Sequence, residues 1–179
     1  MAETLPRIAI TMGDPAGIGP EITVKAVLSS EIRDVCVPIV IGDKSVLHRE
    51  FVRLGAEHQF SADRDSSPIR IVKCEPTLTD FSIGVDSAET GKASAIYIET
   101  AVELWRRGEV DAIATAPISK KALSLAGYKF PGHTEFLAHL TGTDRVGMSF
   151  FGGNLRVVLL STHLSLIDAI KKVTTENLV

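Results

Sequence analysis

The chain alternates between short apolar runs and longer segments in which apolar residues recur every three or four positions. The short runs are rich in β-branched residues and are bounded by glycine, proline or charged residues, as in strands buried on both faces of a sheet. Four runs predict strands: residues 7–12, 35–41, 69–72 and 111–116. Three longer segments predict helices: residues 21–28, 44–54 and 93–107. Strands that alternate with helices predict a layered α/β fold with a largely parallel sheet.

A different pattern follows residue 128. Two apolar runs, 146–151 and 155–160, are joined by a Gly-Gly-Asn turn, which predicts an antiparallel hairpin. The last residues predict a further helix. Because a hairpin interrupts the alternation of strand and helix, the sequence predicts two structural units. We expect a first α/β domain over residues 1–128 and the beginning of a second domain over residues 129–179.

Single residues refine the expected core. The predicted buried face of helix 93–107 consists of Ile98, Ala101, Val102 and Trp105. Cys36 lies between Val35 and Val37 in a predicted buried strand, and Cys74 follows another strand. Both cysteines are therefore expected to be reduced thiols in or near the core, rather than a disulfide or a metal pair.

Composition and charge narrow the class of protein. The 179 residues are 45% hydrophobic and 23% charged, with a net charge of -3 and the two signs interspersed. Such a chain can build an ordinary core, and it lacks the basic surface that nucleic acid or an anionic membrane attracts. No apolar run reaches the length of a membrane span. The first seven residues lack the pattern of a signal peptide, so we expect a cytoplasmic protein.

The first candidate site is the 13–21 segment, Gly-Asp-Pro-Ala-Gly-Ile-Gly-Pro-Glu, between a predicted strand and a predicted helix. Loops at the carboxyl end of a strand are where open α/β sheets bind ligands. The segment is not a dinucleotide fingerprint, because Ile22 stands where a third glycine or alanine is needed, and it is not a P-loop. It fits a ligand-binding loop and a tight strand-to-helix turn about equally well.

Two further segments combine hydroxyl, lysine and histidine side chains. In 115–121, Lys120 follows a strand and could meet an anion, although a cap by Ser119 with the lysine in solvent is the more common arrangement. In 131–136, His133 and Thr134 stand at the start of a predicted helix, where free N–H groups favour anions. A simple helix cap by Thr134 fits the same residues.

The fourth segment, 161–166, contains His163 just past an apolar strand. A lone histidine at a strand end is more often structural than a ligand. A divalent metal needs several ligands, and none lies near His163 in the sequence.

Taken together, the segments 13–21, 115–120, 131–136 and 161–166 closely resemble, in order and spacing, the 4-hydroxythreonine-4-phosphate dehydrogenase family. The resemblance covers essentially the whole chain. It implies an isocitrate/isopropylmalate dehydrogenase-like α/β fold with two domains, of which this chain carries an incomplete part. It also implies a homodimer whose active sites draw residues from both subunits.

The resemblance further implies a chemistry. The family uses NAD to oxidise the C3 hydroxyl of 4-phosphooxy-L-threonine, and the keto acid loses carbon dioxide to give 3-amino-2-oxopropyl phosphate in pyridoxal phosphate biosynthesis. Carried over by position, His133 and Thr134 are expected to bind the substrate, and His163 to be one ligand of a divalent metal, zinc, magnesium or cobalt. Asp14 and Lys120 lie in matching segments without an assigned role.

Members of the family are longer than 179 residues, and the remaining metal ligands and most NAD contacts are expected downstream of Val179. We therefore expect the 1–179 polypeptide alone to be inactive. Two alternatives stay open: a sister dehydrogenase acting on D-threonate or D-erythronate 4-phosphate, and a non-catalytic module for phosphate-ester binding or dimerisation.

Overall fold

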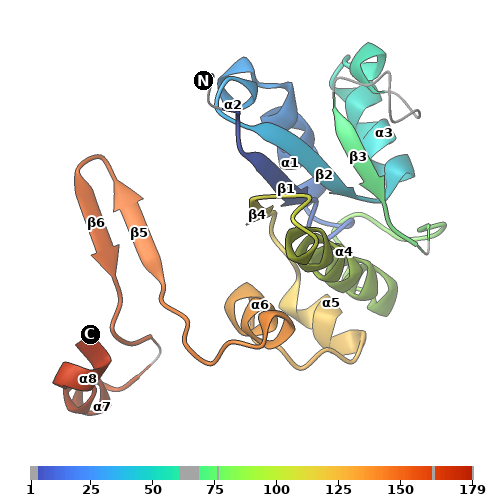
Figure 1. The fold of residues 1–179 in the computed structure, drawn as a ribbon. Coiled ribbons are helices and arrows are strands. Elements are labelled where there is room, and N and C mark those ends of the chain that lie inside the picture. The colour runs from blue at the N-terminus through green and yellow to red at the C-terminus, as the bar shows by residue number, and fades with distance from the viewer. Residues whose placement is uncertain (1–3, 61–68, 76, 163, 179) are drawn as a thin grey trace. The chain divides into compact units, whose positions relative to one another are not determined.

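The computed structural model describes residues 4–60, 69–75, 77–162 and 164–178. Its contacts divide the chain into two compact units, Met1–Thr141 and Gly142–Val179 (Figure 1). The division falls later than the predicted domain boundary at residue 128, because the helix that follows this boundary packs within the first unit.

The first unit contains a four-stranded parallel sheet. Its strands are β1 (Arg7–Thr11), β2 (Val37–Gly42), β3 (Arg70–Lys73) and β4 (Ala112–Thr115). They lie in the order β3-β2-β1-β4, and every neighbouring pair is parallel. The predicted strands and their parallel pairing are confirmed. Because all carboxyl ends of the strands point the same way, the loops after β1 and β4 meet at one edge of the sheet.

Helices surround this sheet. Their bounds are α1 (Gly19–Leu28), α2 (Ser30–Arg33), α3 (Lys44–Arg53), a 3-10 turn η1 (Glu57–Gln59), α4 (Ala88–Arg106), α5 (Lys120–Leu125) and α6 (His133–Thr141). Helix α4 packs against β1, β2 and β4, whereas α1 and α3 pack against each other. The short α2 was not predicted, and α4 begins five residues before the predicted helix.

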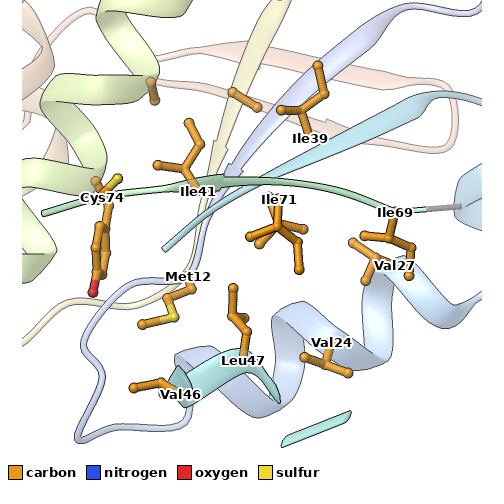
Figure 2. Close-up of a cluster of buried hydrophobic side chains, with 14 of the residues drawn as sticks. Met12, Val24, Val27, Ile39, Ile41, Val46, Leu47, Ile69, Ile71 and Cys74 are labelled. Carbon is orange, nitrogen blue, oxygen red and sulfur yellow. The ribbon is translucent and has the colours of Figure 1, made fainter. Parts of the chain in front are cut away.

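The core of the first unit fills both sides of the sheet, as Figure 2 shows. Ile39 and Ile41 of β2 lie on one side of the strands, with Met12 and Leu47 on the other. All four side chains are at most 2% exposed. This two-sided burial explains why β2 is a continuous apolar run rather than an alternating one.

Three predictions about buried residues are wrong. The strand predicted over 111–116 is not buried, because β4 lies at the edge of the sheet and its Ala112 and Ala114 are exposed. Trp105 is 45% exposed, because α4 turns its buried surface to two separate clusters rather than one. Ala93, Tyr97 and Leu104 face the sheet cluster. Ala95 and Ile98 face a second cluster with Phe136 of α6. The period of the helix is therefore correct, but the assumption of a single apolar face is not.

The third wrong prediction concerns the start of β2. Val35 is 61% exposed and Cys36 is half-buried, because the turn after α2 carries them at the surface before the strand begins, and Val37, the first residue of the strand, is 44% exposed. Cys74 is buried as expected, and both cysteines are free thiols.

Asp43 connects α3 to the loop after β3. Its side chain is the N-cap of α3: one oxygen accepts from the amides of Ser45 and Val46. The other oxygen accepts from the amide of Leu78 at 2.9 Å. Burial by itself raises the pKa of Asp43, but these hydrogen bonds outweigh it and leave the pKa below its ordinary value. A single carboxylate thus connects segments 35 residues apart.

Helices α4 and α5 approach closely at Gly91. A Cβ atom at this position would lie 2.0 Å from the carbonyl oxygen of Ala122. Alanine normally stabilises a helix interior by about 1 kcal/mol relative to glycine. Here the added Cβ would clash with backbone atoms, which cannot move aside. The cost of the clash is therefore larger than the stability gained from the higher helix propensity of alanine.

We therefore expect Gly91→Ala to lower the free energy of unfolding by about 2 kcal/mol. The fluorescence of Trp105, the chain's one tryptophan, reports the transition in urea. Lys92→Ala, at the neighbouring exposed position, is the control and should change stability little. A more stable Gly91→Ala protein would show that the two helices are not held this closely.

The second unit begins with an antiparallel hairpin. Strands β5 (Ser149–Gly152) and β6 (Leu155–Val158) pair as predicted, and Gly153 in the turn has a positive φ of 55°. Helices α7 (Leu166–Lys171) and α8 (Thr175–Leu178) follow. No side chain among the described residues of this unit is buried. None of the helices in the described part of the chain is long and apolar enough to cross a membrane.

Candidate functional site

Two of the candidate segments meet at the carboxyl edge of the sheet. The 13–20 loop follows β1, and its Asp14 amide donates to the carbonyl of Pro117, after β4, at 2.9 Å. Gly13 has a φ of 71°, and a Cβ there would lie 2.2 Å from the same carbonyl oxygen. The glycine is therefore required by both the backbone conformation and the close approach. Neighbouring parallel strands bring together segments about 100 residues apart in sequence.

Asp14 is the buried acid of this edge. The residue is 6% exposed, and its Oδ1 accepts from the amide of Ala16 at 2.9 Å. Burial raises the pKa of Asp14, while hydrogen bonds from Ala16 and Thr90 lower it less. The side chain therefore holds its proton more readily than an exposed aspartate does.

The loop before α4 contributes residues that the sequence analysis did not identify. The Gly84 amide donates to the carbonyl of Ala16 at 2.8 Å. Asp86 accepts a hydrogen bond from Ser119, and its other oxygen lies 3.5 Å from Lys121 Nζ. The Ser119 hydrogen bond lowers the pKa of Asp86. The prediction that Ser119 caps a helix is confirmed, because its hydroxyl accepts from the amide of Ala122.

An open pocket of about 210 Å³ lies between these three segments. Its lining residues are Asp14, Ala16, Gly17, Ile18, Gly84, Val85, Asp86, Pro117, Ile118 and Ser119. The polar side chains among them are two carboxylates and one hydroxyl. The pocket is thus rich in hydrogen-bond acceptors, and no lining side chain carries a positive charge.

His133 lies beside the same edge, at the start of α6. The ring forms a hydrogen bond with the backbone of Ala116, the residue before Pro117. Burial lowers the pKa of His133, and the Ala116 hydrogen bond opposes this effect without cancelling it. The Nε2 atom is buried and has no hydrogen-bond partner among the residues that the structure describes. A buried nitrogen without a partner is costly, and a ligand could satisfy it.

The remaining predicted site residues are Thr134, Lys120 and His163. Thr134 is exposed in the first turn of α6, so it is not the residue that precedes the helix. Lys120 is exposed at the start of α5. His163 lies outside the described residues. Among the residues that the structure does describe, no three histidine, cysteine or acidic side chains are grouped to hold a metal ion. These residues alone do not form a metal site, and the role of His163 stays a prediction.

Comparison with known proteins supplies the context. A family model described as pyridoxal phosphate biosynthetic protein PdxA matches residues 34–179. The D-threonate 4-phosphate dehydrogenase of Cupriavidus necator is 41% identical over 180 residues, covering 97% of this chain and 54% of that protein. The 4-hydroxythreonine-4-phosphate dehydrogenase of Trichlorobacter lovleyi is 40% identical over 181 residues, covering 96% and 54%.

A solved structure gives the same picture. The crystal structure of a 4-hydroxythreonine-4-phosphate dehydrogenase from Burkholderia phymatum matches with a TM-score of 0.89 and 40% identity, covering 98% of this chain and 55% of that one. The chain spans about half the length of the relatives it matches. The likeness confirms the predicted fold class, an incomplete α/β fold of the isocitrate/isopropylmalate dehydrogenase type.

Proposed function

The chain belongs to the PdxA family of pyridoxal phosphate biosynthetic proteins, and from this premise we propose that the protein is an NAD-dependent dehydrogenase of 4-phosphooxy-L-threonine. The C3 hydroxyl loses its proton, and NAD takes the hydride from C3. The resulting β-keto acid releases carbon dioxide and takes up a proton, giving 3-amino-2-oxopropyl phosphate. The observation that carries the proposal is the meeting of two motif segments, 13–20 and 115–121, at one sheet edge, with the unpartnered Nε2 of His133 in a third motif segment beside them.

In this proposal, His133 and Thr134 bind an anionic group of the substrate. Both residues stand in the first turn of α6, whose free amides and dipole favour negative charge. The ring of His133 is held against the Ala116 backbone, so its position does not depend on the ligand. Thr134 is exposed and offers a hydroxyl to the same group.

A second candidate is oxidation of D-threonate 4-phosphate or its D-erythronate analogue. One relative named D-threonate 4-phosphate dehydrogenase is 41% identical to this chain. A second relative, named as a putative D-threonate 4-phosphate dehydrogenase, is 37% identical. The two substrate classes share a phosphate and a carboxylate. They differ at C2, where one carries an ammonium group and the other a hydroxyl.

Because the 1–179 polypeptide alone is expected to be inactive, the test uses the full-length protein. It supplies NAD and each substrate separately, with zinc, magnesium or cobalt, and follows reduced nicotinamide by absorbance and carbon dioxide by trapping. The proposal predicts both products from 4-phosphooxy-L-threonine. Turnover of D-threonate 4-phosphate alone would establish the second candidate. Binding of the phosphate esters without turnover, and without dependence on NAD or metal, would indicate a non-catalytic binding module.

The proposal includes a divalent metal with His163 as one ligand, a cytoplasmic location and a homodimer. These rest on family membership. Calorimetry of zinc binding to the wild-type chain and to His163→Ala tests whether His163 is a metal ligand. Sedimentation tests whether the protein is a homodimer. Equal zinc affinity in the two proteins would remove His163 from the proposal.

The pKa of His133 gives a prediction about anion binding. In the free protein burial holds this pKa below its ordinary value, so the ring is neutral near pH 7. An anion beside the ring favours the charged form and raises the pKa. Binding therefore takes up a proton, and affinity should increase as the pH falls from the bound-state pKa toward the free-state pKa.

Sulfate is the suitable probe because, unlike phosphate, it does not titrate near neutral pH. We expect sulfate to bind more tightly at roughly pH 5 than at pH 8, with His133→Gln removing the dependence. His139→Gln, an exposed histidine of the same helix, is the control. NMR titrations at several pH values measure the affinity. A dependence that persists in His133→Gln would assign it to another group.

A further inference from the structure

We infer that Asp14 is a substrate-binding residue whose carboxylate accepts a hydrogen bond from the ammonium group of the substrate. The inference rests on the proposed function and deepens it, because it states which end of the phosphorylated acid enters the pocket at the 13–20 loop. It also favours the amino-acid substrate over the threonate, since only the former carries an ammonium group.

The Asp14 carboxylate has hydrogen-bond acceptor positions that the protein does not use. An ionised carboxylate has about four lone-pair positions. Asp14 receives one hydrogen bond from the Ala16 amide at 2.9 Å and one from the Thr90 hydroxyl. Only 6% of the residue is exposed, so the remaining positions are accessible mainly from the pocket that Asp14 lines. Because Asp14 lines the pocket, a donor on a bound ligand can reach it.

The charge of the pocket wall favours a cationic group over an anionic one. The second carboxylate, that of Asp86, is already engaged by Ser119 and Lys121. The rest of the lining is small or apolar, apart from the Ser119 hydroxyl, and no cationic side chain belongs to it. A phosphate group here would face the carboxylate of Asp14, which has no cationic partner in the pocket lining, while the ammonium of Lys121 is already paired with Asp86. An ammonium group would instead gain a charge-assisted hydrogen bond.

Thr90 is the positioning residue for this carboxylate. It lies in the first turn of α4, and its hydroxyl carries a single proton. The competing acceptor, the carbonyl of Ser87, is 3.3 Å away, and the Ser87 hydroxyl donates to Thr90 Oγ1 at the same distance. An ionised Asp14 is the stronger acceptor of the two. When Asp14 is charged, it can therefore take the Thr90 proton in preference to the Ser87 carbonyl, and this contact would orient the carboxylate.

The test compares wild type with Asp14→Asn, which keeps the shape and the acceptor for Ala16 but removes the charge. Calorimetry gives the affinity of each protein for 4-phosphooxy-L-threonine and for D-threonate 4-phosphate. We expect Asp14→Asn to weaken binding of the former by on the order of 10- to 100-fold and of the latter by less than about fivefold. Asp86→Asn, which removes a charge from the same pocket wall, should affect both less.

An equal loss for both ligands, or no loss, would overturn the inference and leave Asp14 a residue of the fold. If neither phosphorylated acid binds the wild type, the proposed function fails, and ethanolamine still tests Asp14. The inference predicts that ethanolamine shifts the amide resonances of Ala16 and Gly17 in wild type but not in Asp14→Asn. Identical shifts in both proteins would reject it.

A second variant covers the case in which Asp14→Asn does not fold. Thr90→Val should weaken ammonium-ligand binding several-fold and raise the NMR-measured pKa of the Asp14 carboxyl, while Thr90→Ser restores both. Thr100→Val is the matched control, because Thr100 lies on the same helix, bonds to the carbonyl of Ile96 at 2.7 Å and lies away from the pocket lining. Equal effects of Thr90→Val and Thr100→Val would contradict the positioning role.

Discussion

Gly13→Ala should destabilise the first unit by about 4 kcal/mol. The residue has a φ of 71°, a conformation that costs an alanine about 1–2 kcal/mol. Its new Cβ would also lie 2.2 Å from the carbonyl oxygen of Pro117 and 2.9 Å from that of Ala116. Overpacking against backbone adds about 1–3 kcal/mol. A loss of this size is a large fraction of the roughly 5–15 kcal/mol that stabilises a domain.

The matched control is Gly55→Ala. Gly55 has a φ of 68°, but a Cβ there would meet nothing within 4 Å. It therefore shares the conformational cost with Gly13 and lacks the clash. Urea unfolding followed by Trp105 fluorescence gives both values. Equal losses in the two variants would mean that the segments after β1 and β4 can separate at little cost, and the site geometry would then need revision.

The second large effect is expected for Asp43→Ala, at about 3 kcal/mol. The substitution removes an N-cap, worth roughly 0.5–2 kcal/mol, and leaves the amide of Leu78 without its acceptor. The control is Ser87→Ala, which removes the N-cap of α4 and two hydrogen bonds with Thr90, one from the Thr90 amide and one to the Thr90 hydroxyl, but no contact with a distant segment. A cost no greater than that of Ser87→Ala would show that the Leu78 contact contributes nothing.

The same residue sets a dependence on pH. The pKa of Asp43 is below its ordinary value in the folded protein. Its contribution to stability is therefore complete above the unfolded-state pKa, about 3.9, and is lost as the pH falls through the folded-state value. The stability difference between wild type and Asp43→Ala should shrink in acid. A constant difference down to low pH would contradict the assigned hydrogen bonds.

The positions of the strands could be predicted from the sequence, but the burial of individual side chains could not always be. Apolar runs bounded by Gly and Pro located all four strands of the sheet, although the edge strand β4 proved to be partly exposed. The exposure of Trp105 could not be predicted, since α4 packs on two clusters that come from distant parts of the chain. Periodicity reports that a helix has buried positions, and it does not report how many neighbours share them.

The candidate site divides in the same way. Asp14, His133 and Thr134 stand in glycine- and proline-containing segments after strands or before helices, which made them visible in the sequence. Asp86 and Thr90 were missed because they lie in a loop and a helix start without a distinctive motif. Their importance comes only from contacts with Ser119 and Asp14, 33 and 76 positions away. Such contacts depend on the sheet order.

That order also has a consequence for how the chain folds. Strand β1 lies in the interior of the β3-β2-β1-β4 sheet, between β2 and β4. The first strand to be synthesised therefore lacks one of its two neighbours until β4, the last of the four, has been made. Arg7 and Asp111, which join β1 to β4, are 104 residues apart. Closing so long a loop costs chain entropy before any contact repays it, which slows folding. During synthesis, β1, β2 and β3 can associate early, whereas the 13–20 loop acquires its neighbours at residues 116 and 117 only after most of the first unit has emerged.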